Sequence, residues 1–204
     1  PAEGRGLFKK QSGGRGQYGD ATITIEPNER GSGIEIESKI VGGSIPREFI
    51  PAVQKGIQET IQGGVLAGYE MIDLKVTIVD GSYHEVDSSE IAFKMAGILA
   101  TKEAVSKAGA VLLEPMMKVE ATTPDEYQGD IIGDMNRRRG EVEGIDSKSS
   151  GTVITAKIPL AMMIGYATDI RSLSSGRASY SMEPYRFEQV PNSISEEILD
   201  KIKK

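Results

Sequence analysis

The residues best suited to acid–base chemistry lie in one short stretch. His84 is the only histidine of the 204 residues, and Asp87 and Ser88 follow it closely. A histidine, a carboxylate and a hydroxyl are the parts of a hydrolytic triad. However, Asp87 and Ser88 stand just before a run with helical periodicity, where both residue types commonly cap helices. The stretch therefore favours a helix start, and we predict that no residue of this chain is catalytic.

Metal and thiol chemistry lack their usual ligands. The sequence has no cysteine and no second histidine, and these are the ligands that zinc prefers. No cluster of carboxylates along the chain replaces them. We therefore predict no metal site, no disulfide and no thiol nucleophile.

A second stretch has groups that contact nucleic acid. Residues 11–19 read QSGGRGQYG, with four glycines among the last seven residues. The nucleotide-binding pattern Gly-x-x-x-x-Gly-Lys-Ser/Thr is missing, and a strand rather than a helix follows. By itself such a loop fits a surface turn. Arg15, Gln17 and Tyr18 add groups that contact a phosphate, a base edge and a base face.

Charge points to local rather than bulk contacts. The formal net charge is -6, which argues against indiscriminate binding to nucleic acid. Two basic patches remain, in residues 1–19 and at Arg137, Arg138 and Arg139. Both are compatible with a plain solvated surface. No apolar run approaches the roughly 18 residues that span a bilayer, so we expect a cytoplasmic protein without a membrane partner.

The first half predicts the order ββαβα. Residues 22–26 and 34–40 alternate like half-buried strands, and residues 72–79 do the same. Residues 47–62 and 88–107 carry helical stripes. We expect Asp87 to cap the second helix, with Glu90 at capping-box spacing. Its expected buried residues are Ile91, Met95, Ile98, Leu99 and Val105.

The second half, from residue 114, predicts the order β-α-β-β-α-β. That order fits a ferredoxin-like sandwich of an antiparallel sheet and two helices. Ser193 and Glu196 are spaced to cap a short final helix, which we expect to dock on one of the domains because it is too short to be stable alone. The fold class is therefore α+β, with domains at 1–113 and 114–204.

Several motifs resemble elongation factor G. Residues 11–19 are similar to the opening motif of its domain IV, as are residues 41–48, 64–69, 81–84 and 86–90. Residues 113–117, 129–134, 137–140, 165–168 and 171–173 resemble its domain V. Departures are mild: Glu85 stands where the family more often has Asp, and Ser44 where an apolar residue is common.

The resemblance implies the C-terminal part of a factor that moves tRNA and mRNA through the ribosome. It implies a left-handed βαβ crossover in a ribosomal-protein-like first domain, which mimics tRNA. It also implies a tip that enters the decoding site and contacts tRNA, mRNA and rRNA. The tip residues would be Ser12, Gly13, Gly14, Arg15, Gly16, Gln17, Tyr18, Ser82, Tyr83, His84 and Glu85.

The resemblance further implies that Arg137, Arg138 and Arg139 are candidates for contact with large-subunit RNA. The partners would be both ribosomal subunits, the tRNA anticodon arm and mRNA, and the chain would be a monomer. We expect no cofactor here, because GTP and Mg²⁺ bind the family's N-terminal domains. A ribosome-recycling or ribosome-protection paralogue is the alternative, since such paralogues can share much of the tip sequence.

Overall fold

The computed structural model describes residues 1–11 and 13–204. The chain divides into two compact units, Pro1–Val111 and Leu112–Lys204. The first unit ends slightly before the boundary expected from the sequence. Both units combine helices with one sheet, which confirms the α+β fold class.

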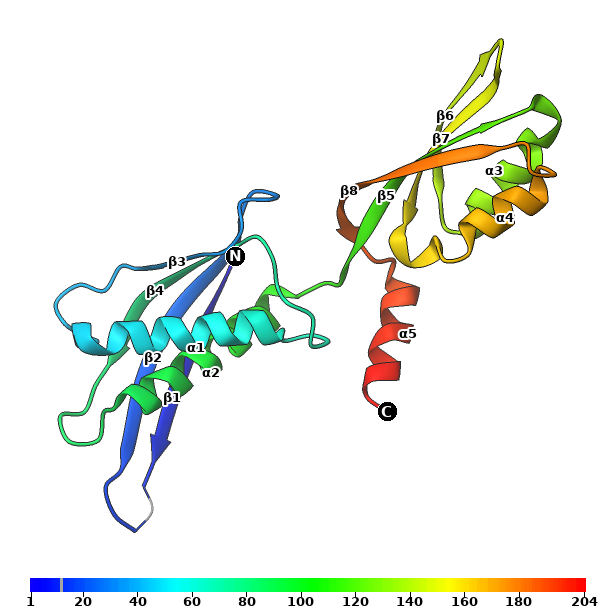
Figure 1. Ribbon diagram of the computed structural model, residues 1–204. Helices are drawn as coiled ribbons and strands as arrows, with labels where there is room; N and C mark the ends of the chain where they lie inside the picture. The colour runs from blue at the N-terminus through cyan, green and yellow to red at the C-terminus, as the bar shows by residue number, and fades with distance from the viewer. Residues whose placement is uncertain (12) are drawn as a thin grey trace. The chain divides into compact units, whose positions relative to one another are not determined.

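Unit 1 contains a four-stranded sheet with two long helices on one face (Figure 1). Its elements are β1 (Ala2–Lys10), β2 (Gln17–Pro27), β3 (Glu35–Ser38), the 3-10 turn η1 (Arg47–Phe49), α1 (Ile50–Gly63), β4 (Leu74–Ser82) and α2 (Glu90–Ala108). The strand order is β1-β2-β4-β3. β3 pairs with β4 in parallel, and the other pairs are antiparallel. The unit joining β3, α1 and β4 is therefore a βαβ crossover, whose hand stays an expectation from the family.

Strand β1 was not expected from the sequence. Its apolar alternation is interrupted by Gly4 and Gly6, which lie directly beneath α2. A Cβ at Gly6 would stand 1.9 Å from the carbonyl oxygen of Ala96. At Gly4 it would stand 2.3 Å from the carbonyl oxygen of Ala100. Only glycine permits this approach of strand to helix, so the residues that weaken the strand pattern are the ones that the packing requires.

The buried face of α2 differs from the prediction. It is formed mainly by small residues, namely Ala92, Ala96, Gly97, Ala100 and Ala104, together with Phe93, Thr101 and Val105. Ala96, Ala100 and Ala104 lie against the glycines of β1, whereas Ala92 lies against Gly19 of β2 and Gly97 against Val53 of α1. Ile91, expected inside, is 66% exposed, and Leu99 is also exposed. The prediction ranked side chains by hydrophobicity, whereas close packing against glycine selects for small volume.

Unit 2 is a four-stranded antiparallel sheet with the order β6-β7-β5-β8, as in a ferredoxin-like fold. Its elements are β5 (Leu113–Thr123), η2 (Asp125–Tyr127), α3 (Gln128–Arg137), β6 (Glu141–Lys148), β7 (Gly151–Pro159), η3 (Leu160–Met162), α4 (Tyr166–Leu173), β8 (Ser179–Gln189) and α5 (Asn192–Ile202). Its core includes Val119, Met135 and Ile154.

The final helix departs from its prediction in two ways. α5 begins at Asn192 after Pro191, and no side-chain cap from Ser193 forms. None of its residues is buried, and Ile202 is 51% exposed. Ile194 and Ile198 of the expected apolar stripe are half-buried, so the stripe is covered only in part.

One polar group in the core of unit 2 lacks a partner among the described residues. The Tyr166 side chain is buried, and its hydroxyl makes no hydrogen bond. Burial, reinforced by Asp134, raises the pKa of Tyr166 to about 12. Its ring still packs edge-on against Tyr180, with centroids 4.8 Å apart. The ring of Tyr166 therefore packs in the core, whereas its hydroxyl contributes no hydrogen bond.

Replacing Tyr166 with phenylalanine is expected to leave the free energy of unfolding unchanged or raise it by up to about 1 kcal/mol, because an unsatisfied buried hydroxyl is removed. Urea unfolding of the 204-residue chain measures this. Tyr185→Phe is the control, since its hydroxyl accepts a hydrogen bond from Lys157 at 3.1 Å. A loss larger than about 1 kcal/mol for Tyr166→Phe would show that the hydroxyl has a stabilising partner.

Candidate functional site

Two loops meet at one end of unit 1. The β1–β2 hairpin turn and the β4–α2 loop lie at the lower left of Figure 1. The backbone N–H of Tyr18 donates to the carbonyl of Asp87 at 2.9 Å. Arg15 Nε donates to the carbonyl of Val86 at 3.1 Å. We call this end the tip: residues 13–18 and 82–88. Ser12, also expected there, lies outside the described residues.

The β4–α2 loop is closed by its own hydrogen bonds. The Ser88 hydroxyl accepts from the His84 N–H at 2.8 Å, and the Ser88 N–H donates to the His84 carbonyl at 2.9 Å. Ser89, not Asp87, is the N-cap of α2, and its hydroxyl accepts from the N–H of Ala92. Our prediction for the cap was therefore wrong by two positions. Ser88 serves loop closure, so these residues do not form a triad.

The Asp87 carboxylate faces the inside of the tip. Its Oδ2 lies 3.7 Å from His84 Nδ1. A Cβ at Gly16 would stand 2.9 Å from the same oxygen. A side chain at position 16 would therefore displace the Asp87 carboxylate from this place, while the backbone of the two loops could stay where it is.

Aromatic rings and unhindered backbone form the exposed surface of the tip. The Tyr18 and His84 rings are 6.0 Å apart between centroids and tilted by 51°. The His84 side chain is 58% exposed, and Tyr83 and Glu85 are exposed beside it. Gly13 and Gly14 have no atom within 4 Å of an added Cβ. Such a surface can stack on bases and bring peptide groups close to a phosphate backbone.

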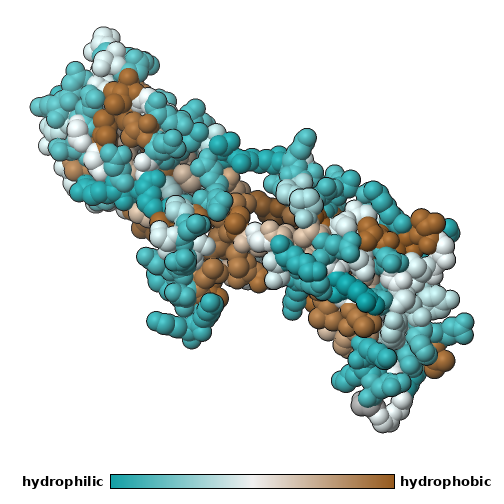
Figure 2. All heavy atoms as spheres, turned by 180° about the vertical axis from the view of Figure 1, so that it is seen from behind, coloured by the Kyte–Doolittle hydropathy of each residue, from teal (hydrophilic) through white to brown (hydrophobic). Residues whose placement is uncertain are grey.

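Polar and weakly apolar groups dominate around these rings. In Figure 2 the end of unit 1 that carries the two loops is mainly white and teal. Arg15 and Gly14 are exposed, whereas Gln17, Tyr18 and Ser82 are half-buried at the ends of β2 and β4. The structure thus brings together every described tip residue that the sequence proposed. It adds Asp87 and Ser88, which the sequence assigned to the helix start.

The three consecutive arginines of unit 2 have different environments. Arg138 is buried: it forms ion pairs with Asp134 and Asp169 and donates to the carbonyls of Met162 at 2.6 Å and Ile164 at 3.1 Å. Its guanidinium is therefore used inside unit 2 and leaves little surface for the expected contact with RNA, which stays a prediction.

The neighbours of Arg138 differ in how much charge they offer to a partner. Arg139 makes a two-point ion pair with Glu114, at 3.0 and 2.8 Å. The Arg137 side chain is 72% exposed and lies 3.4 Å from Asp134. Of the three arginines, only Arg137 presents most of its surface to an RNA partner.

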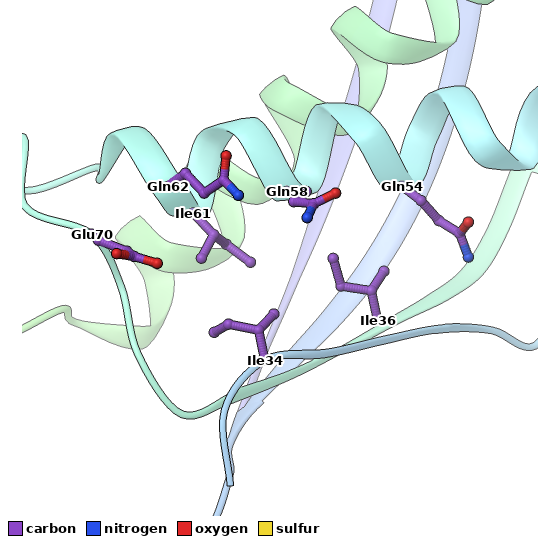
Figure 3. A pocket seen from close by; sticks show the side chains of 7 residues that line it. All are labelled: Ile34, Ile36, Gln54, Gln58, Ile61, Gln62 and Glu70. Atoms are coloured by element: carbon purple, nitrogen blue, oxygen red, sulfur yellow. The ribbon is translucent and has the colours of Figure 1, made fainter. Parts of the chain in front are cut away.

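A groove elsewhere in unit 1 has no features of a site. It has a volume of 310 Å³ and lies between α1 and the segment around β3. Figure 3 shows Gln54, Gln58 and Gln62 along α1 above Ile34 and Ile36. The adjoining edge strand β3 is short and carries Glu35 and Glu37, features that discourage pairing with another strand. The groove shares no residue with the tip.

Neither a metal centre nor a membrane-spanning helix is found in the part of the chain that the structure describes. Within residues 1–11 and 13–204, no group of three or more His, Cys, Asp or Glu residues is placed to hold a metal ion. In the same residues, no helix is both long and apolar enough to span a membrane. The fold and the tip together define a two-domain α+β module whose candidate site is a binding surface.

Comparison with known proteins identifies the family. The model for elongation factor G, domain IV, matches residues 1–109, and the model for the elongation factor G C-terminus matches residues 111–198. The chain belongs to the elongation factor G family. The two matched regions are non-catalytic parts of a translation elongation factor, and neither is the GTPase domain.

A solved structure supports the same fold. It is a crystal structure of a protein from Thermus thermophilus, with 37% sequence identity and a TM-score of 0.82. The similarity covers 99% of this chain and 30% of that one. This chain therefore spans less than a third of the length of that protein.

Proposed function

We propose that this chain is the ribosome-contacting part of a translation elongation factor, and that its tip enters the decoding site during movement of tRNA and mRNA. The observation that supports this most is the exposed His84 ring, with the half-buried Tyr18 ring 6.0 Å away, beside the open backbone of Gly13 and Gly14. Single-stranded or looped RNA is recognised by stacking and by contacts to base edges. The tip has the groups for both.

The charge of the chain fits a transient contact. A net charge of -6 opposes broad attraction to RNA, so binding relies on polar groups at the tip and on single cations such as Arg15 and Arg137. Such binding is weak and is weakened further by salt. A factor that must leave the ribosome after each step needs this kind of affinity.

The two units would contact different subunits of the ribosome. The tip would contact the tRNA anticodon arm and mRNA in the small subunit, and Arg137 would approach large-subunit RNA. The protein would act in the cytoplasm as a monomer. GTP and Mg²⁺ would bind other domains of the full-length factor, so this chain by itself would bind no nucleotide.

Replacing His84 with alanine is expected to slow translocation about tenfold while leaving GTP cleavage largely unchanged, since a contact of about 1.4 kcal/mol made during movement is lost. The free energy of unfolding should change by no more than about 0.5 kcal/mol, because the His84 ring is outside the core. The measurements are single-turnover translocation and GTP cleavage with the full-length factor, plus thermal unfolding.

Tyr69→Ala is the matched control, because Tyr69 is 62% exposed and lies in the α1–β4 loop, at the other end of β4 from the tip. It should translocate at the normal rate. Equal loss of translocation and GTP cleavage in His84→Ala would assign the residue a structural role. Ribosome splitting without translocation by the unmutated factor would assign the chain to a recycling paralogue.

A further inference from the structure

A chain of hydrogen bonds leads from the middle of the sheet to the tip. Asp20 on β2 accepts from Arg5 on β1, with Nε at 2.9 Å and Nη2 at 3.0 Å. The Ser82 hydroxyl on β4 donates to Asp20 Oδ2 at 2.7 Å. The Tyr18 and Ser82 hydroxyl oxygens are 2.7 Å apart. We call Arg5, Asp20, Ser82 and Tyr18 the Asp20 network.

Strand register places these residues on one face of the sheet. Asp20 is paired with Ser82 across β2 and β4 and with Leu7 across β1 and β2. Arg5 and Tyr18 are each two residues from a member of these pairs, so all four side chains point the same way. The helices cover the opposite face, where Gly6 and Gly19 contact α2. The network is therefore separate from the hydrophobic core of unit 1.

The carboxylate determines the direction of every hydrogen bond in the network. Asp20 is only 4% exposed, and burial acts to raise its pKa. The hydrogen bonds from Arg5 and Ser82 outweigh this, so the pKa of Asp20 lies below its usual value. An ionised carboxylate only accepts, so the single hydroxyl hydrogen of Ser82 points to Asp20. In its bond with Tyr18, Ser82 can then act only as the acceptor, so the Tyr18 O–H is the donor.

We propose that Asp20 is the positioning residue of the tip: through Ser82 it holds the Tyr18 hydroxyl and thereby fixes the Tyr18 ring beside His84. The Tyr18 ring has one end tied to Ser82, while its backbone N–H is tied to Asp87. With both ends held, the ring keeps its orientation next to the exposed imidazole. A pre-organised contact loses less conformational freedom on binding RNA. The role in RNA binding rests on the proposed function, whereas the positioning of the ring does not.

The test removes the middle of the chain of hydrogen bonds. In Ser82→Ala the Arg5–Asp20 ion pair remains, but Tyr18 loses its acceptor. The nuclear Overhauser contacts between the Tyr18 and His84 rings of the 204-residue chain are expected to be lost. Tyr18→Phe should have the same effect. The double variant should be no worse than either single one, because both break one bond. Ser38→Ala, on β3 away from the tip, should retain the contacts.

Asp20 itself is tested by Asp20→Asn, whose carboxamide cannot accept from Arg5 and Ser82 as the carboxylate does. The ring contacts should again be lost. This variant also leaves Arg5 without its counter-ion and can fail to fold, so Ser82→Ala decides the matter in that case. In the full-length factor, Ser82→Ala should slow translocation about tenfold, with GTP cleavage retained.

The two readouts separate the two proposals. Ring contacts that persist in Ser82→Ala overturn the positioning role, whatever the translocation rate. Ring contacts that are lost while translocation keeps its normal rate support the positioning role and overturn the proposed function of the tip. Loss of both supports both.

Discussion

The variant Gly6→Ala is expected to lower the free energy of unfolding of unit 1 by about 3 kcal/mol or more. An added Cβ would stand 1.9 Å from the carbonyl oxygen of Ala96 and 2.6 Å from the backbone nitrogen of Ala100. Both neighbours are backbone atoms of α2, so no side-chain rotation can relieve the overlap. Overpacking of this kind typically costs 1–3 kcal/mol and occasionally more, and the displaced helix contributes eight buried residues to the core.

Denaturant unfolding of the 204-residue chain, followed by amide signals of β1 and α2, measures this loss. Gly14→Ala is the control, because nothing lies within 4 Å of its added Cβ. Its stability should stay within about 0.5 kcal/mol of the unmodified chain. A change below about 1 kcal/mol in Gly6→Ala would mean that α2 can move away from β1 at little cost, against the close packing inferred here.

The second large effect is expected from Arg138→Met. This change leaves Asp134, which is only 7% exposed, without its closer ion-pair partner. It also removes the donor to the carbonyls of Met162 and Ile164 in the segment before α4. Breaking a buried ion pair from one side typically costs 3–5 kcal/mol. We therefore expect unit 2 to lose about that much free energy of unfolding.

The neighbouring Arg137 provides the matched control. Arg137→Met removes an exposed cation and should change stability by less than about 1 kcal/mol. If the proposed function holds, it should weaken ribosome binding and reduce the salt dependence of that binding. Arg138→Met with normal stability, together with a loss of ribosome binding, would restore Arg138 as a candidate RNA contact.

Much of the fold followed from apolar periodicity. The helices near 47–62 and 88–107 and the βαββαβ order of unit 2 appear in the structure with shifted ends. β1 could not be predicted in this way, because Gly4 and Gly6 interrupt its apolar alternation. These glycines are required by the close packing of α2 on the strand. The buried face of α2 was misjudged for the same reason. Volume matching between two elements is a tertiary property, which the periodicity of one segment does not contain.

The tip was found through its motifs, but its supporting residues were not. Asp20 lies in phase with Thr22 and Thr24 on β2, so the alternation marks it as an ordinary polar residue. Arg5 is 15 positions from it in sequence. Nothing local shows that the two will pair. Arg138 carried no signal either, since a buried arginine and an exposed one look alike between Arg137 and Arg139.

The contact between β1 and α2 also bears on how unit 1 responds to force. Where alanine lies on glycine, the helix rests on peptide groups, and no flexible side chain separates the two layers. A force applied at the tip acts first on β1 and β2. It reaches α2 through direct contacts between backbone atoms, with no rotatable side chain in between. Side-chain layers are more compliant, because rotamers can change under load. Unit 1 should therefore behave as a rigid body under load and transmit displacement along its length with little internal deformation.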